Sequence, residues 1–130
     1  MLMYLSNLKN QISDQMSQES IPTITVEELA SRLAEGRENL QLVDVREPQE
    51  VQLARIEGFE VFPLSQHEEW SGQIHSKLDA EKETLVLCHH GMRSAQMCQW
   101  LMQQGFSNVK NIVGGIDAYS AIVDPRVPRY

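Results

Sequence analysis

Short apolar runs alternate with amphipathic stretches from residue 21 onward, at intervals of about 20–25 residues. The runs are continuous rather than alternately apolar and polar, which is typical of strands that are buried on both faces of a parallel sheet. The predicted strands are Ile21–Thr25, Leu40–Val45, Phe59–Leu64, Thr84–Cys88 and Val109–Val113.

Helices are expected between these strands, because the flanking residues fit helix caps and stops. Thr25 with Glu28, and Ser65 with Glu68, have capping-box spacing. The predicted helices are Val26–Glu35, Pro48–Ala54, a stretch from Ser65 through Trp70, Arg93–Gln104 and Gly115–Val123. The pattern predicts an α/β fold, a three-layer sandwich with a central, mostly parallel sheet of about five strands.

The chain divides into a tail and a single domain. Residues 1–20 are rich in Gln, Ser and Asn and are expected to form a flexible tail or a short helix. Residues 21–130 are long enough for one domain with its own core.

The net charge of −7 argues against nucleic acid or a membrane surface as a partner. The chain also has no run of about 18 apolar residues that would predict a membrane span. An anionic substrate would therefore need a locally positive pocket.

The two cysteines, Cys88 and Cys98, are ten residues apart and do not form the pattern of a disulfide framework. We therefore expect a reducing, cytoplasmic location, where a thiol is free for chemistry or packed in a core. Cys98 falls on the apolar side of its predicted helix, which leaves core packing and a resolving thiol for Cys88 as its two interpretations.

Candidate chemistry begins at Cys88, where the most apolar strand ends. Ligands of parallel sheets bind at the carboxyl ends of strands. Gly91 allows a tight curl whose N–H groups turn inward, and the following helix adds its positive dipole end. Both stabilise an anion, while Arg93 adds a cation with bidentate reach and Ser94 can cap the helix or donate to a substrate. This loop suits a nucleophilic thiolate and an anionic substrate.

Three segments together resemble the single-domain rhodaneses, a family of thiosulfate and related sulfurtransferases. Residues 88–94, CHHGMRS, are similar to the family's active-site loop. Residues 42–50, LVDVREPQE, resemble its D-V-R-x-x-x-E signature, and residues 114–119, GGIDAY, its closing G-G-x-x-x-W/Y segment. The resemblance spans about Ile21 to Tyr130. One departure is ARIEGF at residues 54–59, where the family often has G-H-I-P-G-A.

The resemblance implies a rhodanese-like sandwich and a two-step reaction on Cys88. The thiolate would take sulfur from thiosulfate or a similar small anionic donor, giving a persulfide. Cyanide or a thiol or protein acceptor would then remove the sulfur, in a ping-pong scheme without metal or organic cofactor. The binding loop would comprise His89, His90, Gly91, Met92, Arg93 and Ser94.

Several of these residues also have a plainer interpretation. His89 and His90 are expected to form the pocket wall rather than a metal site with Cys88, because three consecutive residues cannot easily converge on one ion. Arg93 is either a substrate contact or an internal partner that holds the loop.

Three further residues, Asp44, Arg46 and Glu50, are interpreted as supporting scaffold. Asp44 ends a strand near the loop, where it can accept loop N–H groups, and Arg46 with Glu50 has the spacing of an ion pair. Gly114 and Gly115 are expected to form only a tight turn between strand and helix.

Two other functions remain open. Phosphatases and arsenate reductases of a related fold have one more residue between Cys and Arg, and the shorter loop here favours sulfur over phosphate. A persulfide carrier or interaction module that serves a biosynthetic partner is the second alternative.

Overall fold

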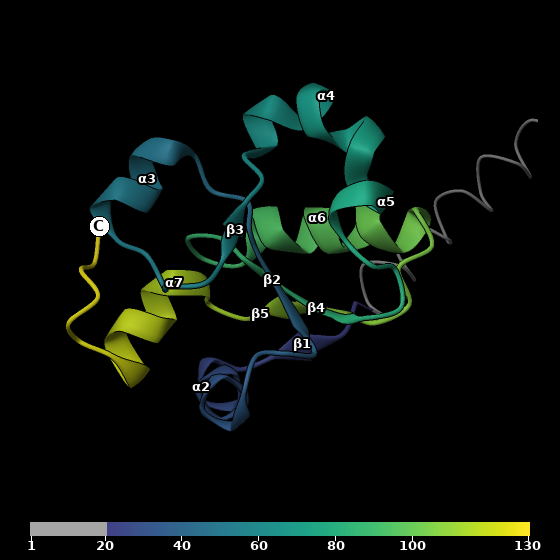
Figure 1. Ribbon diagram of the computed structural model, residues 1–130. Coiled ribbons are helices and arrows are strands. Elements are labelled where there is room, and N and C mark those ends of the chain that lie inside the picture. Colours follow the sequence, from purple (N-terminus) through teal and green to yellow (C-terminus); the bar gives the residue numbers. More distant parts are fainter. Residues whose placement is uncertain (1–20) are drawn as a thin grey trace, which may run out of the picture.

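The computed structural model describes residues 21–130, and the predicted tail lies outside this part. Within it, five strands form one parallel sheet: β1 (Thr23–Ile24), β2 (Leu40–Asp44), β3 (Glu60–Val61), β4 (Glu83–Leu87) and β5 (Val109–Ile112). Their order is β1-β5-β4-β2-β3, so β4 lies at the centre of the sheet (Figure 1). The predicted fold class is confirmed.

Helices cover both faces of this sheet (Figure 1). On one face lie α4 (His67–Trp70), α5 (Ile74–Lys77) and α6 (Met92–Gln103), and on the other α2 (Val26–Glu35) and α7 (Gly115–Ala118). A further short helix, α3 (Pro48–Leu53), follows β2. None of the helices within residues 21–130 has both the length and the apolar character needed to cross a membrane.

Residues of β4 and the next position alternate between the two cores. Leu85 and Leu87 pack with α2 and α7, whereas Val86 and Cys88 pack with α4, α5 and α6. None of the four is more than 1% exposed. Full burial of a Leu or Val side chain contributes about 1.5–3 kcal/mol. The buried residues of β4 therefore hold the start of the following loop in a fixed position.

Cap chemistry explains one predicted helix start and corrects another. Oγ1 of Thr25 accepts the Glu28 N–H, and the Glu28 carboxylate accepts the Thr25 N–H, both at 3.1 Å, as the capping box predicts. The predicted Ser65–Glu68 box is wrong. The Ser65 hydroxyl donates instead to the Glu47 carboxylate, and a 3₁₀ turn at Leu64–Gln66 precedes α4.

Other boundaries differ by a few residues. β3 is shorter than predicted, and α5 lies in a region where no helix was predicted. The last predicted helix is α7 followed by a π-helical turn at Tyr119–Val123, after which Asp124 is extended.

Candidate active site

Cys88 follows β4 directly and opens the loop that leads into α6. Its Sγ accepts the N–H of Gly91 at 3.0 Å and lies 3.2 Å from Oγ of Ser94. Gly91 has φ of +105°, in the region that favours glycine, and this conformation lets the chain turn from the loop into α6. Because Cys88 is only 1% exposed, the sulfur sits inside the loop rather than on the open surface.

The start of α7 fixes the direction of the loop's peptide groups. Ile116 donates its N–H to the carbonyl oxygen of Cys88 at 2.9 Å, and Asp117 donates to that of His89 at 3.1 Å. In a trans peptide the C=O and N–H point in opposite directions, so the N–H groups of these two peptide units are directed away from α7. These two contacts hold the carbonyl oxygens of Cys88 and His89 toward α7, so neither oxygen competes with the Gly91 N–H at the sulfur.

Ser94 connects the thiol to β5. Its hydroxyl donates to Oδ1 of Asn111 at 2.5 Å, and the Asn111 amide donates to the carbonyl of Gly91 at 3.0 Å. This second bond fixes which end of the amide faces Ser94. A neutral thiol can donate to Ser94, whereas a thiolate can receive the Ser94 hydroxyl instead.

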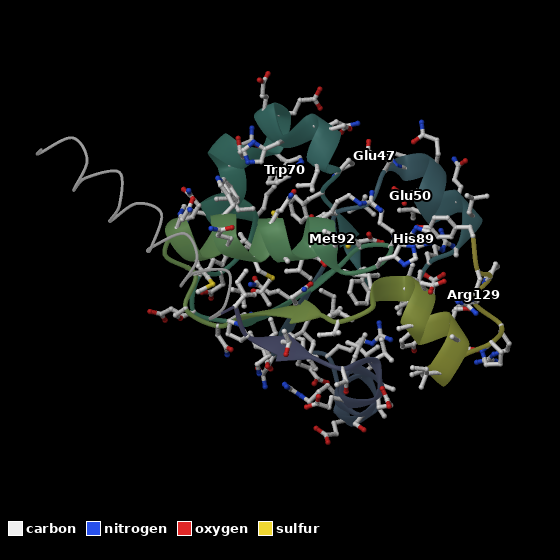
Figure 2. All side chains as sticks on the ribbon, turned by 180° about the vertical axis from the view of Figure 1, so that it is seen from behind. Glu47, Glu50, Trp70, His89, Met92 and Arg129 are labelled. Carbon is white, nitrogen blue, oxygen red and sulfur yellow. The ribbon has the colours of Figure 1, made fainter. Side chains whose placement is uncertain are left out.

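Arg93 is an internal partner in this structure. Its two terminal nitrogens donate to the two oxygens of Glu50 at 2.7 and 2.8 Å, and Glu50 extends from α3 toward the loop (Figure 2). The hydrogen bonds from Arg93 lower the pKa of Glu50 to about 2, and the same pairing raises the pKa of Arg93. The second of the two predicted roles of Arg93 is the one observed.

Arg46 does not pair with the carboxylate of Glu50, so the predicted ion pair is wrong. Arg46 is fully buried and binds the Asp44 carboxylate at 2.7 Å, while Asp44 also accepts the backbone N–H of Arg46. Asp44 is therefore occupied by Arg46 instead of accepting loop N–H groups. The two charges compensate each other beside the end of β2, because a buried charge requires a partner.

The two histidines and the methionine lie at the outer side of the loop. The rings of His89 and His90 are 3.9 Å apart, and Nδ1 of His90 is 3.9 Å from the Asp117 carboxylate. Met92, labelled in Figure 2, lies near the start of α6. Its side chain is 79% exposed. It borders a groove of about 340 Å³ that runs along α6 and has no charged side chain in its lining of Ile21, Gly91, Met92, Ala95, Gln96 and Gln99.

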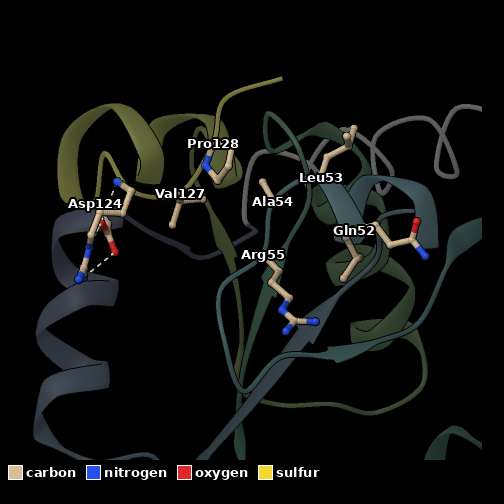
Figure 3. A pocket seen from close by; sticks show the side chains of 9 residues that line it. Gln52, Leu53, Ala54, Arg55, Asp124, Val127 and Pro128 are labelled. Carbon is tan, nitrogen blue, oxygen red and sulfur yellow. Dashed lines mark hydrogen bonds and ion pairs between the residues drawn. The ribbon is translucent and has the colours of Figure 1, made fainter.

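The chain after α7 returns to the site, which sequence reasoning missed. The ring of Tyr130 stacks on that of His89 at 3.9 Å with an interplanar angle of 7°. Its hydroxyl accepts from Arg46 and donates to Glu50, both at 3.0 Å. The returning segment and α3 also line a groove of about 660 Å³, which contains no loop residue (Figure 3).

Cys98 is fully buried among the residues that pack under α6, as the core interpretation predicts. Burial raises the pKa of its thiol to about 12. Both cysteines are free thiols in the structure.

The charges around the loop are balanced. Within residues 21–130, each guanidinium that approaches the loop has a carboxylate partner: Arg46 with Asp44, Arg93 with Glu50 and Arg129 with Asp117. Within residues 21–130 no unpaired arginine therefore supplies the positive pocket that the sequence predicts, and the backbone group that contacts the sulfur is the N–H of Gly91. This arrangement suits a thiolate or another compact, weakly charged sulfur anion.

Comparison with known sequences identifies relatives over most of the chain. Residues 25–122 match the family described as "Rhodanese-like domain". The chain is 50% identical over 114 residues to "Rhodanese-like/PpiC domain-containing protein 12, chloroplastic" of Arabidopsis thaliana, covering 86% of this chain and 38% of the plant protein. It is 39% identical over 95 residues to "Putative sulfurtransferase YtwF" of Bacillus subtilis, covering 71% of this chain and 84% of that protein. The chain thus spans less than half of the plant relative.

Solved structures agree with this result. A crystal structure of a rhodanese-like domain protein from Staphylococcus aureus superposes with a TM-score of 0.66 and 26% identity, covering 76% of this chain and 91% of that one. A rhodanese-related protein from Thermoplasma volcanium superposes with a TM-score of 0.64 and 27% identity, covering 82% and 95% of the two chains.

Proposed function

Because the chain belongs to the rhodanese-like domain family, we propose that it is a sulfurtransferase in which Cys88 carries sulfur as a persulfide. The observation that supports this most strongly is the position of the Cys88 sulfur, which accepts the Gly91 N–H at 3.0 Å inside the loop. Hydrogen bonds of this kind stabilise a thiolate and would equally stabilise the anionic outer sulfur of a persulfide. His89, His90, Met92, Arg93 and Ser94 complete the proposed binding loop.

The first step forms one bond and breaks one. The Cys88 thiolate attacks the outer sulfur of thiosulfate, a new S–S bond forms, and sulfite leaves with the electron pair of the broken S–S bond. In the second step cyanide attacks the outer sulfur of the persulfide. Thiocyanate forms, the S–S bond breaks, and the thiolate is regenerated. Neither step needs a metal or an organic cofactor.

The charge balance favours a thiol-bound donor over thiosulfate as the better substrate. Thiosulfate is a dianion, and the arginines near the loop are already paired with carboxylates. A hydropersulfide, R–S–SH, brings less charge and releases the thiolate R–S⁻ when Cys88 takes its outer sulfur. The uncharged groove beside Met92 offers such a donor, or a thiol acceptor, a route to the loop.

The test is intact mass after incubation with donor and desalting, with wild type, Cys88→Ser and the matched control Cys98→Ser. We expect wild type and Cys98→Ser to gain the mass of one sulfur atom and lose it to cyanide with release of thiocyanate. Cys88→Ser should gain none. The proposal fails if no donor adds sulfur to the wild type, or if Cys88→Ser gains it equally.

The same assay separates the donors and the rival functions. The persulfide of 2-mercaptoethanol, which has no charged group apart from its sulfur, should load Cys88 faster than thiosulfate at equal concentration, and the reverse order would contradict the charge argument while leaving the role of Cys88 intact. Hydrolysis of an aryl phosphate would support the phosphatase alternative. A persulfide that is loaded and removed only by protein partners would identify a carrier module. The cytoplasmic location stays a prediction.

A further inference from the structure

One side chain outside the loop makes contacts that reach both of its ends. Tyr130 stacks on His89, the residue immediately after Cys88. Its hydroxyl donates to Glu50, whose carboxylate holds Arg93, the residue at the other end of the loop. Tyr130 therefore contacts one end of the segment from Cys88 to Arg93 directly, through His89, and the other end indirectly, through Glu50.

We infer that Tyr130 is a positioning residue for Cys88, which fixes the curvature of the loop around the reactive sulfur. The ring holds the His89 side, and the hydroxyl holds Glu50 and through it Arg93. This inference rests on the proposed sulfur chemistry of Cys88, whose reactivity depends on the N–H groups that the curved loop presents to the sulfur.

A tyrosine suits both contacts, because its hydroxyl accepts and donates at the same time. It accepts from Nη1 of Arg46 and donates to Oε1 of Glu50. Burial raises the pKa of Tyr130, so the phenol keeps the proton that it donates at neutral pH. The pKa of Glu50 is lowered to about 2, so its carboxylate stays an acceptor. Phenylalanine could supply the stack but not these two bonds.

Contacts with the folded domain hold Tyr130 in place. Arg129 donates to both oxygens of Asp117 at 3.0 and 3.1 Å, and the Ser120 hydroxyl donates to the carbonyl of Val127. Val127 and Tyr130 both pack against the core beneath α7. Because Asp117 also donates its N–H to the His89 carbonyl, the segment and the loop share one anchor.

The experiment compares wild type, Tyr130→Phe and Tyr130→Ala in the chain of residues 1–130. Tyr119→Phe is the matched control, because it removes a phenol hydroxyl for which residues 21–130 supply no hydrogen-bond partner. Leu33→Ala controls for stability, because it removes packing from α2, away from the loop. The readouts are the rate of Cys88 alkylation by iodoacetamide as a function of pH, the rate of persulfide loading, and the free energy of unfolding.

Tyr130→Ala should alkylate about tenfold more slowly at pH 7, the order expected for loss of one stacked pair with its hydrogen bonds. Its rate–pH profile should move to higher pH. Tyr130→Phe should recover most of this loss and remain about threefold slower, since it restores the ring without the hydroxyl. Tyr119→Phe and Leu33→Ala should alkylate like wild type.

Wild-type rates and pH profile in Tyr130→Ala would overturn the inference, as would an equal slowing in Leu33→Ala, which would reduce the effect to stability. The two proposals can fail separately. If wild-type Cys88 never gains sulfur, the sulfurtransferase proposal fails, while the alkylation profiles still report whether Tyr130 positions the thiol.

Discussion

Gly115 lies against the peptide oxygen of Cys88 with no room for a side chain between them. A β-carbon at Gly115 would come within 2.4 Å of the carbonyl oxygens of both Cys88 and His89. These two carbonyl oxygens cannot easily move away, because they accept hydrogen bonds from the N–H groups of Ile116 and Asp117, the next two residues of α7. The absence of a side chain at position 115 is therefore part of the geometry of the thiol loop.

Gly115→Ala should consequently displace the loop and suppress sulfur loading by Cys88. Gly105→Ala is the matched control, because Gly105 also has positive φ, +94°, but has open space where a β-carbon would stand. Both variants should lose about 1 kcal/mol of stability from backbone strain. Only Gly115→Ala should also lose Cys88 reactivity, measured by alkylation. Equal reactivity in the two variants would contradict this account.

Ser94→Ala should slow persulfide formation about tenfold, because the thiolate loses a hydroxyl that lies 3.2 Å from its sulfur and can turn from Asn111 to donate to it. The variant also leaves Oδ1 of Asn111 without its donor, so a loss of about 1–2 kcal/mol in unfolding free energy is expected. Thr84→Val serves as the control. Thr84 also has a buried hydroxyl, but it lies on β4 at the end away from the loop, where it donates to the Lys82 carbonyl and accepts from the Gln41 amide. Normal loading by Ser94→Ala would show that this hydroxyl does not assist the sulfur.

Glu50→Gln should flatten the acid dependence of stability. The carboxyl has a pKa of about 2 in the folded protein against an ordinary 4.5, so its contribution is complete above pH 4.5 and is lost as the pH falls toward 2. Between these values only the unfolded chain takes up the proton. Denaturant titrations at pH 7 and pH 3 should differ by about 2 kcal/mol less in the variant than in wild type.

Glu83→Gln is the control for this measurement. Glu83 pairs with Arg32 and Lys110 at the amino end of β4, and its pKa is likewise lowered to about 2. Glu83→Gln should show a similarly flattened acid dependence of stability but normal alkylation of Cys88. Glu50→Gln should show the same flattening together with slower alkylation of Cys88. A Glu50→Gln variant with wild-type alkylation would show that the ion pair with Arg93 is not needed to hold the loop.

Cys98 should stay unmodified in the native protein at pH 8. Burial raises the pKa of its thiol to about 12, so almost no thiolate is present at that pH, and Cys98 has no loop N–H beside it to stabilise one. Mass spectrometry after brief treatment with iodoacetamide should find one modified cysteine in the native chain and two after denaturation in urea. Two in the native chain would mean that the α6 core opens readily.

Patterns within short segments carried most of what could be predicted about the fold. Continuous apolar runs such as Thr84–Cys88 predicted the parallel sheet, and the Thr25 capping box marked the start of α2. The Ser65 prediction failed because Glu47, which is distant in sequence, competes for that hydroxyl. Such competition depends on tertiary packing and leaves no trace in the spacing of Ser65 and Glu68.

The same division holds for the site. The strand end, Gly91 and the helix start predicted the loop and its thiol, because these features are local. Asn111 and Tyr130 were missed, since β5 and the returning segment meet the loop only in the folded chain. The pairing of Glu50 was also misassigned, because the sequence offers Arg46 at helical spacing and cannot reveal that Arg93 lies closer.

The central position of β4 has a consequence for the order in which the protein matures. Two strands, β2 and β5, must pair with β4 before the sheet is complete, and β5 follows β4 in the chain. During synthesis Cys88 emerges before β5, α7 and Tyr130 exist, so the nascent thiol lacks Asn111, the α7 anchors and the stacked phenol. These contacts are non-local, since they join Cys88 and its neighbours to segments that follow α6 in the chain. The sulfur can therefore gain its supporting contacts only after β5, α7 and Tyr130 have docked, and a nascent chain that ends at α6 would carry a cysteine without them.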